Sequence, residues 1–406
     1  MKRLAKFLPI LALYVLLVLL ADSPQSPLSD AGRYLWFAEN LTKGYYSPTT
    51  KINLWSGPGY PLVLVPVVAM ENPFSAGAAI NVGLMFAALA YFYYTARRYI
   101  GDRYATVTTY VLGLWPPILR MVPMVMTEVL AILLACGFAF HLSSLHRGGR
   151  RRWIHLALAA AFLGYLALTR VIFGYVIPAA LVLILILYVV RRRRALLRDA
   201  LVCCLALLVC LPYLHYTYTV TGKVYYWGDS GGMSLYWMSS PYEGELGDWH
   251  PMRAAITDPN LADKHRAFFS SLGKESTVKT DEALKQKAIE NIKAHPDKYF
   301  RNWIANLGRL LFAYPRTQSV PKLKTLLDVV PGMFLTVIGA LCIYPTYVKR
   351  RQIPHEIWVM LLVGLVYFGG SSLVSALSRF MLPITPICFL WISFVLTRIV
   401  KIRLLA

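Results

Sequence analysis

The sequence lacks the short motifs that mark nucleotide binding and several common hydrolases. It has no Walker loop and no Gly-x-Gly-x-x-Gly turn, so nothing in it suits a nucleotide-linked donor. It also has no Gly-x-Ser-x-Gly elbow and no His-Glu-x-x-His pair. Candidate catalytic residues must therefore be found from their position along the chain.

Cysteine and acidic residues are few. The six cysteines all lie in apolar runs without metal-ligand spacing, so we interpret them as packing residues.

The charged residues are mostly basic: the sequence has 20 acidic residues against 42 lysines and arginines, which gives a formal net charge of +22. The basic residues cluster between apolar runs, a pattern typical of cytoplasmic loops and not of a nucleic-acid surface. The clusters are 97–98, 150–152, 191–194, 349–351, and Lys401 with Arg403.

Long apolar runs dominate the chain. Hydrophobic residues make up 57% of it, against about 45–50% in a soluble domain. Runs of roughly 18 or more apolar residues predict transmembrane helices, so we expect an all-α integral membrane protein with about ten spans. The predicted spans are 7–21, 76–96, 105–119, 122–140, 153–168, 171–190, 201–218, 329–348, 357–374 and 381–400.

The basic clusters also predict the orientation. With the N-terminus in the cytoplasm, every cluster falls on the cytoplasmic side, and an even number of spans returns the C-terminus there. The first span imitates a signal peptide, but Leu19 disfavours cleavage after Ala21, so we expect a retained helix. The chain then divides into 1–218, a membrane module with an outer loop at 22–75; 219–328, an outer loop with a small helical region; and 329–406, the last spans.

Both outer loops contain helical patterns. In the first, apolar and aromatic residues predict an amphipathic helix from Asp30 to Thr42 at the outer leaflet. In the second, 227–247 indicates an irregular surface. Two amphipathic helices are predicted after it, one at 281–294 and one that begins at Pro296. We therefore expect interfacial helices in the first outer loop and a small helical cap in the second.

Charges near or within spans are costly and usually mark function. Five of them fall on the outer face in the predicted topology: Asp30, Glu128, Arg170, Asp328 and Arg379. A carboxylate can act as a general base, and arginines can stabilise a phosphate leaving group. Together with a large apolar surface, these groups suit a lipid-phosphate donor. Simpler roles stay open: Asp30 could cap its helix, Glu128 could only pair with an arginine, and the arginines could anchor at the interface.

Several motifs resemble, in order, those of the GT-C glycosyltransferases, such as the protein O-mannosyltransferases and the lipid A aminoarabinose transferases. The first outer loop carries the clearest of them, an acidic residue followed by an aromatic, a Gly-Tyr pair and a Pro-Gly-Tyr-Pro turn. The matching segments are 29–34, 44–45, 57–61, 127–128, 168–170, 231–236 and 379–386.

The resemblance implies a GT-C fold and inverting transfer of a sugar from a polyprenyl phosphate, such as an undecaprenyl carrier. The acceptor would be a glycan, lipid or protein at the outer face of the plasma membrane, the inner membrane of a bacterium. Asp30 matches the residue taken as the catalytic base. Ala31 stands where relatives often carry a second acidic residue, so we assign no metal and expect no cofactor. The candidate substrate-binding residues are Arg33, Tyr34, Tyr45, Tyr60, Glu128, Arg170 and Arg379.

Alternative interpretations remain at this stage. Tyr45 and Tyr60 could be ordinary interface aromatics. A polytopic transporter or lipid flippase would share the apolar spans, but it predicts charges near the bilayer midplane and an inverted repeat. A membrane acyltransferase would need a histidine at the active face.

Overall fold

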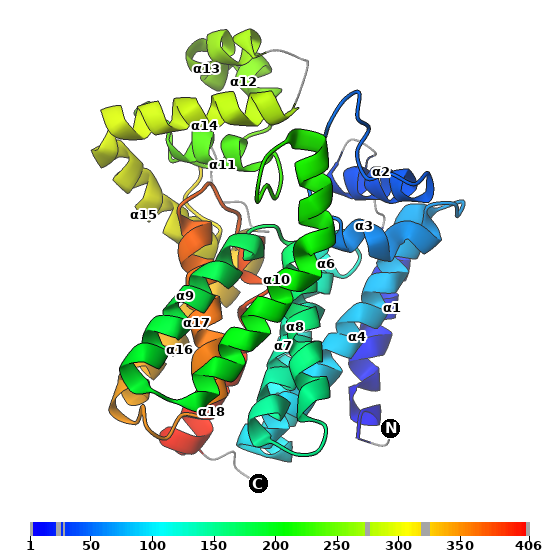
Figure 1. Ribbon diagram of the computed structural model, residues 1–406, viewed down its shortest axis with the longest axis vertical. Coiled ribbons are helices and arrows are strands. Elements are labelled where there is room, and N and C mark those ends of the chain that lie inside the picture. Colours follow the sequence, from blue (N-terminus) through cyan, green and yellow to red (C-terminus); the bar gives the residue numbers. More distant parts are fainter. Residues whose placement is uncertain (1–2, 22–25, 27–28, 273–276, 318–324, 403–406) are drawn as a thin grey trace.

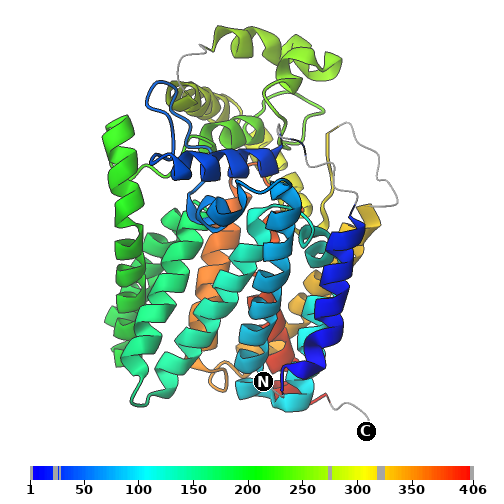
Figure 2. The same cartoon turned by 90° about the vertical axis from the view of Figure 1, so that its right-hand side faces the viewer.

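The structure is a computed structural model that describes residues 3–21, 26, 29–272, 277–317 and 325–402. Every regular element in these ranges is a helix (Figure 1). A bundle of long helices stands beneath a layer of mostly shorter ones, and the two views agree on this arrangement (Figures 1 and 2). The expected all-α class is confirmed. Arg403, which belongs to the last basic cluster, lies outside the described residues.

Within the described ranges, six helices are long and apolar enough to cross a membrane, so the chain is a multi-pass membrane protein. They are α4 (Pro73–Ile100), α7 (Thr127–Arg147), α8 (Arg152–Thr169), α9 (Phe173–Arg191), α10 (Arg194–Thr221) and α16 (Leu326–Val348).

The other four predicted spans also fall on helical segments, but on shorter ones. These are α1 (Leu8–Leu20), α5 (Asp102–Gly113) with α6 (Pro116–Met121), α17 (His355–Ser372), and α18 (Thr385–Phe394) with its π-helical continuation.

Prolines explain where the structure departs from the predicted boundaries. The span expected at 105–119 is broken, because Pro116 cannot continue a helix and instead starts α6. The span expected at 122–140 begins later, at Thr127, after Pro123 has interrupted the chain. As a result, Glu128 lies in the first turn of α7.

The basic clusters gather at one end of the bundle. The α4–α5, α7–α8, α9–α10 and α16–α17 turns lie at the end where α1 begins and α18 finishes, opposite the layer of short helices (Figures 1 and 2). This arrangement agrees with the alternation of spans that the sequence predicts. The positive-inside rule would place this end in the cytoplasm.

The predicted first outer loop contains α2 (Asp30–Thr42) and α3 (Gly59–Leu64), which lie at the end of the bundle opposite the basic turns (Figures 1 and 2). The Ser29 hydroxyl accepts a hydrogen bond from the Gly32 amide at 3.5 Å, so Ser29, and not Asp30, caps α2. A Cβ atom at Gly59 would lie 2.4 Å from Thr169 Oγ1. Glycine therefore lets α3 pack directly against the end of α8, beside Arg170.

The predicted second outer loop contains the cap. It consists of α11 (Gly231–Met238), α12 (Ala254–Thr257), α13 (Pro259–Ser271), α14 (Thr277–Ala294) and α15 (Pro296–Phe312). The expectation of an irregular surface at 227–247 is wrong for α11, which forms because Met233, Tyr236 and Trp237 pack into the cap core. Helix α14 starts four residues before its predicted start, and α15 begins at Pro296 as predicted.

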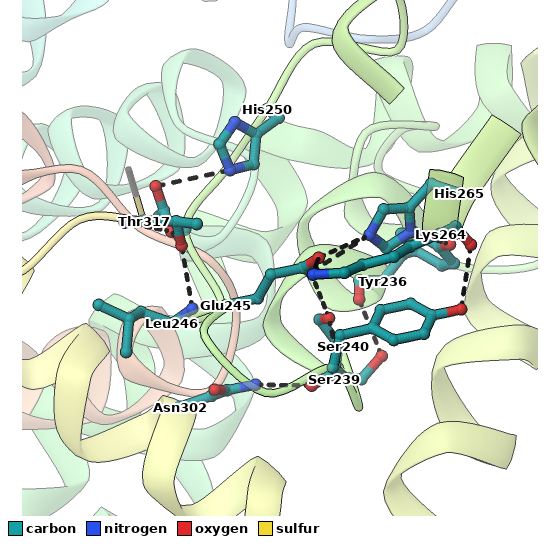
Figure 3. Close-up of polar contacts among 12 residues, drawn as sticks. Tyr236, Ser239, Ser240, Glu245, Leu246, His250, Lys264, His265, Asn302 and Thr317 are labelled. Atoms are coloured by element: carbon teal, nitrogen blue, oxygen red, sulfur yellow. Dashed lines mark hydrogen bonds and ion pairs between the residues drawn. The ribbon is translucent and has the colours of Figure 1, made fainter. Parts of the chain in front are cut away.

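Polar contacts hold the cap together (Figure 3). The Glu245 carboxylate accepts a hydrogen bond from Ser240 and lies 3.2 Å from His265 Nε2 on α13. Asn302 on α15 donates to the Ser240 carbonyl at 3.0 Å. Buried carboxylate and amide groups need hydrogen-bond partners. Because these groups find their partners in one another, the network fixes α13 and α15 around the segment that follows α11.

Helix α15 buries its polar side and exposes its apolar side. Lys298, Asn302 and Arg309 are buried, whereas Phe300 and Ile304 are more than half exposed. Asn306 donates to the Ser372 and Val374 carbonyls at 2.8 and 2.7 Å. These bonds attach the cap to the segment that leads from α17 to Arg379.

Candidate functional site

The first residues of α2 meet a segment from the far end of the chain. Arg379 lies in η4 (Ser378–Met381), just before α18, and its Nη2 atom is 2.8 Å from Asp30 Oδ2. Arg33, one turn along α2, places its Nη2 atom 2.6 Å from Asp30 Oδ1. Each oxygen of the Asp30 carboxylate thus faces a guanidinium group.

Glu128 extends this contact into the bundle. Its side chain is fully buried, and its Oε1 atom lies 3.4 Å from Arg379 Nη1 and 3.3 Å from Arg170 Nη1. Arg170 also donates to Thr127 at 3.2 Å and stacks on the Phe380 ring at 4.5 Å. Arg379 therefore bridges the two carboxylates. We call Asp30, Arg33, Glu128, Arg170 and Arg379 the ionic cluster.

The charges within the ionic cluster keep Asp30 ionised. Burial by itself would raise the pKa of Asp30, but the Arg379 and Arg33 guanidiniums outweigh it and hold the pKa below its ordinary value. Guanidinium groups stay protonated in proteins. The cluster thus sets three guanidinium groups against two carboxyl groups, and this excess of cationic groups suits an added anion.

The three predicted tyrosines occupy different places. Tyr34 is buried on α2, and its ring packs edge-on against Tyr60 at 5.5 Å. Tyr60 is fully buried and donates its hydroxyl to Asn81 at 3.0 Å, which fixes the ring that Tyr34 packs against. Tyr45 is 38% exposed and follows the other end of α2, about 18 Å of helix away from Asp30. The structure brings Tyr34 to the ionic cluster and leaves Tyr45 apart from it.

An apolar groove of about 630 Å³ begins beside the ionic cluster. Arg379 lines the end nearest the ionic cluster, together with Arg120 and Asp328, which form an ion pair of 2.7 Å. The groove continues along α16, α17 and α18 to Tyr347 and Arg350 near the opposite end of the bundle. Its apolar walls include Leu335, Gly339, Leu361, Gly364, Phe368 and Leu382. A groove of this extent suits a long, flexible hydrocarbon chain.

Arg120 is a charged residue of the groove that was not identified from the sequence. Asp328 was among the five charges expected at the outer face, and the structure pairs it with Arg120 and not with the ionic cluster. The available signal was a single arginine between two apolar runs on the side that lacks the basic clusters.

The ionic cluster fits a divalent metal poorly. Arg379 already occupies the position between Asp30 and Glu128 where a cation would balance both carboxylates. Within the described ranges, the group of carboxylate and imidazole ligands close enough to share an ion lies elsewhere, around Asp199.

Solved structures share this architecture, although no protein-family model and no curated protein matches the sequence. The archaeal oligosaccharyltransferase AglB from Archaeoglobus fulgidus, in complex with an inhibitory peptide and a dolichol-phosphate, matches with a TM-score of 0.54 at 12% identity. The match covers 98% of this chain and 50% of AglB. The A. fulgidus enzyme tethered to an acceptor peptide gives 0.55 at 13% identity, over 98% of this chain and 49% of that one.

A further match is ArnT from Cupriavidus metallidurans bound to undecaprenyl phosphate, at 16% identity over 96% of this chain and 78% of ArnT. Its TM-score of 0.45 is too low to add to the argument. The AglB matches show the fold alone: the chain has the GT-C type of helical fold that its motifs predicted. The chain spans about half the length of AglB.

Proposed function

We propose that this protein is an inverting glycosyltransferase that transfers a sugar from a polyprenyl phosphate to an acceptor at the extracytoplasmic face. One observation carries the proposal. Arg379 pairs with both carboxylates of the ionic cluster and also lines the apolar groove. Groups that suit a phosphate, a prenyl chain and a proton transfer therefore meet at one residue.

In the proposed reaction, the prenyl chain lies in the groove and its phosphate meets Arg379 at the outer end. The Asp30 carboxylate accepts the proton of the acceptor hydroxyl or amine as that group attacks the anomeric carbon. The bond between this carbon and the phosphate oxygen breaks on the opposite side, so the configuration inverts. Arg379 and Arg170 stabilise the negative charge on the departing polyprenyl phosphate.

Donor binding would also activate the base. Before binding, Arg379 and Arg33 lower the proton affinity of Asp30. A donor phosphate competes with Asp30 for Arg379, and a carboxylate that loses a cationic neighbour becomes more basic. Glu128 holds Arg379 and Arg170 in place during this exchange. Asp30 would thus gain basicity when a donor is present.

Two further observations support parts of this proposal. AglB, which shares the fold, has been solved with a dolichol-phosphate, and this favours a polyprenyl carrier here. The basic turns lie at the end of the bundle opposite the ionic cluster (Figures 1 and 2), which favours a cytoplasmic location for both termini. The acceptor class stays open between glycan, lipid and protein.

The proposal is tested with purified protein in lipid nanodiscs and a panel of labelled sugars on undecaprenyl phosphate. We expect Asp30→Asn to lower transfer by about 10²–10⁴-fold, the usual contribution of a general base, and to retain donor binding. Glu39→Gln is the matched control, because it removes an exposed carboxylate from the same helix. A folded Asp30→Asn protein that transfers sugar at the native rate would refute the base assignment. Uptake into sealed vesicles without transfer would favour the transporter alternative.

A further inference from the structure

A second polar cluster lies at the end of the bundle opposite the ionic cluster. It joins His146 near the end of α7, Asp199 early in α10 and His355 at the start of α17. The Nε2 atoms of His146 and His355 each lie 2.6 Å from a different oxygen of Asp199. All three groups offer ligand atoms within 4.8 Å of one another. We call these residues the His–Asp–His cluster.

We propose that the His–Asp–His cluster binds one divalent transition-metal ion of the Zn²⁺ type. Two imidazole nitrogens and one carboxylate oxygen form a ligand set that zinc favours. At Zn–ligand distances of about 2.0–2.2 Å, tetrahedral ligands lie about 3.4 Å apart. In the structure each histidine nitrogen lies 2.6 Å from an Asp199 oxygen, and the three ligand atoms all lie within 4.8 Å of one another. Small side-chain rotations would therefore bring the three groups around one ion.

Because the Asp199 carboxylate is buried, a positive charge beside it would stabilise the cluster. The Asp199 side chain is fully buried and His146 is nearly so. The two imidazoles lie within hydrogen-bond distance of this carboxylate, and a negative charge is costly to bury without a cation beside it. A bound cation compensates it directly. His355 is 24% exposed, which leaves a path from the solvent and room for a water molecule as fourth ligand.

The surroundings select the kind of ion. Arg147 follows His146 directly, and the basic clusters 150–152 and 349–351 flank the same turns. Hard cations such as Mg²⁺ prefer oxygen ligands and retain several waters, so they would gain one carboxylate here and meet this positive charge. An ion bound through imidazole nitrogen gains ligand bonds that outweigh the repulsion. The cluster should therefore prefer Zn²⁺ to Mg²⁺.

The proposed ion would fasten one wall of the groove. Helix α17 starts at His355 and contributes Trp358, Leu361 and Phe368 to the groove lining. An ion shared with His146 and Asp199 would fix the start of this helix to α7 and α10. This inference does not depend on the proposed glycosyl transfer, because it concerns metal binding alone.

The test uses the full-length protein without a histidine tag, stripped with a chelator and dialysed. We expect isothermal titration to show one Zn²⁺ bound per chain, with Mg²⁺ bound at least tenfold more weakly. We expect Co²⁺ to give the visible absorption of a site with nitrogen ligands. His355→Gln should weaken Zn²⁺ binding at least as much as the roughly 10–100-fold typical of losing an outer-shell partner. His355 lies at the rim, so this variant should fold even if Asp199→Asn does not.

His155→Gln is the control, because it disrupts the separate His141–His155 pair, whose Nδ1 atoms lie 2.9 Å apart. It should leave Zn²⁺ affinity and stoichiometry unchanged. Three results would overturn the proposal: no Zn²⁺ uptake at micromolar concentration, native affinity in His355→Gln, or loss of binding in His155→Gln alone.

Discussion

The protein carries a buried carboxylate cluster at each end of its helical bundle, and the two differ in their partners. At the end opposite the basic turns, Glu128 and Asp30 face three arginines. At the other end, Asp199 faces two histidines. A guanidinium has only donors and keeps its charge, whereas a neutral imidazole carries a lone pair. The same need to satisfy a buried carboxylate thus produces one site suited to anions and one suited to cations.

The surroundings reinforce this difference. The ionic cluster adjoins the apolar groove, so an anion that binds there can bring a long hydrocarbon chain with it. The His–Asp–His cluster opens past His355 among basic turns, so only an ion held by ligand bonds should stay. Helix α17 connects the two regions, because it begins at His355 and lines the groove toward Arg379.

The largest expected effect concerns the cation that joins the ionic cluster to the groove. Arg379→Gln should lower sugar transfer by about 10²–10³-fold, the typical cost of losing one group that stabilises a developing anion. It should also weaken binding of undecaprenyl phosphate. Arg350→Gln is the control, because it removes a guanidinium that lines the opposite end of the same groove. Equal effects of the two variants on transfer would contradict the distinction between the two ends.

The next prediction separates the two buried carboxylates. Glu128→Gln should lower the free energy of unfolding by about 1–3 kcal/mol, since its arginines lose a charged acceptor, and added Zn²⁺ should not change this loss. Asp199→Asn should abolish the stabilisation that Zn²⁺ gives to the native protein. Thermal unfolding of both variants in nanodiscs, with Zn²⁺ or with a chelator, measures the difference. The comparison fails if Zn²⁺ stabilises the native protein and Asp199→Asn alike.

The smallest expected effect is on pH dependence. Because the pKa of Asp30 is lowered, its carboxylate stays ionised as the pH falls through the ordinary aspartate range, and the base is lost only at lower pH. Arg33→Gln removes one of the two cations, so the pKa of Asp30 should rise. The acidic limb of kcat/KM for sugar transfer should then move to higher pH than in the native protein. An unchanged profile would show that Arg33 does not tune this carboxylate.

Much of the fold could be predicted from the sequence, because the signals are local. Helix α2 begins and ends at the predicted residues, since Ser29 caps it and its apolar positions repeat at helical spacing. The spans follow from long apolar runs. The errors arise where tertiary contacts override local pattern: α11 is a helix because Met233, Tyr236 and Trp237 fill the cap core, and their glycine-rich context concealed it.

The candidate sites were predicted unequally. The outer charges could be placed on one face from topology, but the pairing of Asp328 with Arg120 required coordinates. The His–Asp–His cluster gave no signal along the chain, because 53 residues separate His146 from Asp199 and 156 separate Asp199 from His355. Motifs based on sequence spacing detect metal ligands that lie on one helix or loop. They miss ligands that come from three separate helices, as in this cluster.

The sequence by itself determined that this chain crosses a membrane repeatedly, which end of the bundle is basic, and that a GT-C fold was to be expected. Apolar runs and charge clusters determine these properties because each segment's preference for lipid or water depends mainly on its own composition, and little on contacts with the other segments. Only the tertiary structure decided that Arg379 bridges Asp30 and Glu128 at the mouth of a groove. That contact joins residues 349 positions apart, and its geometry depends on how the helices pack.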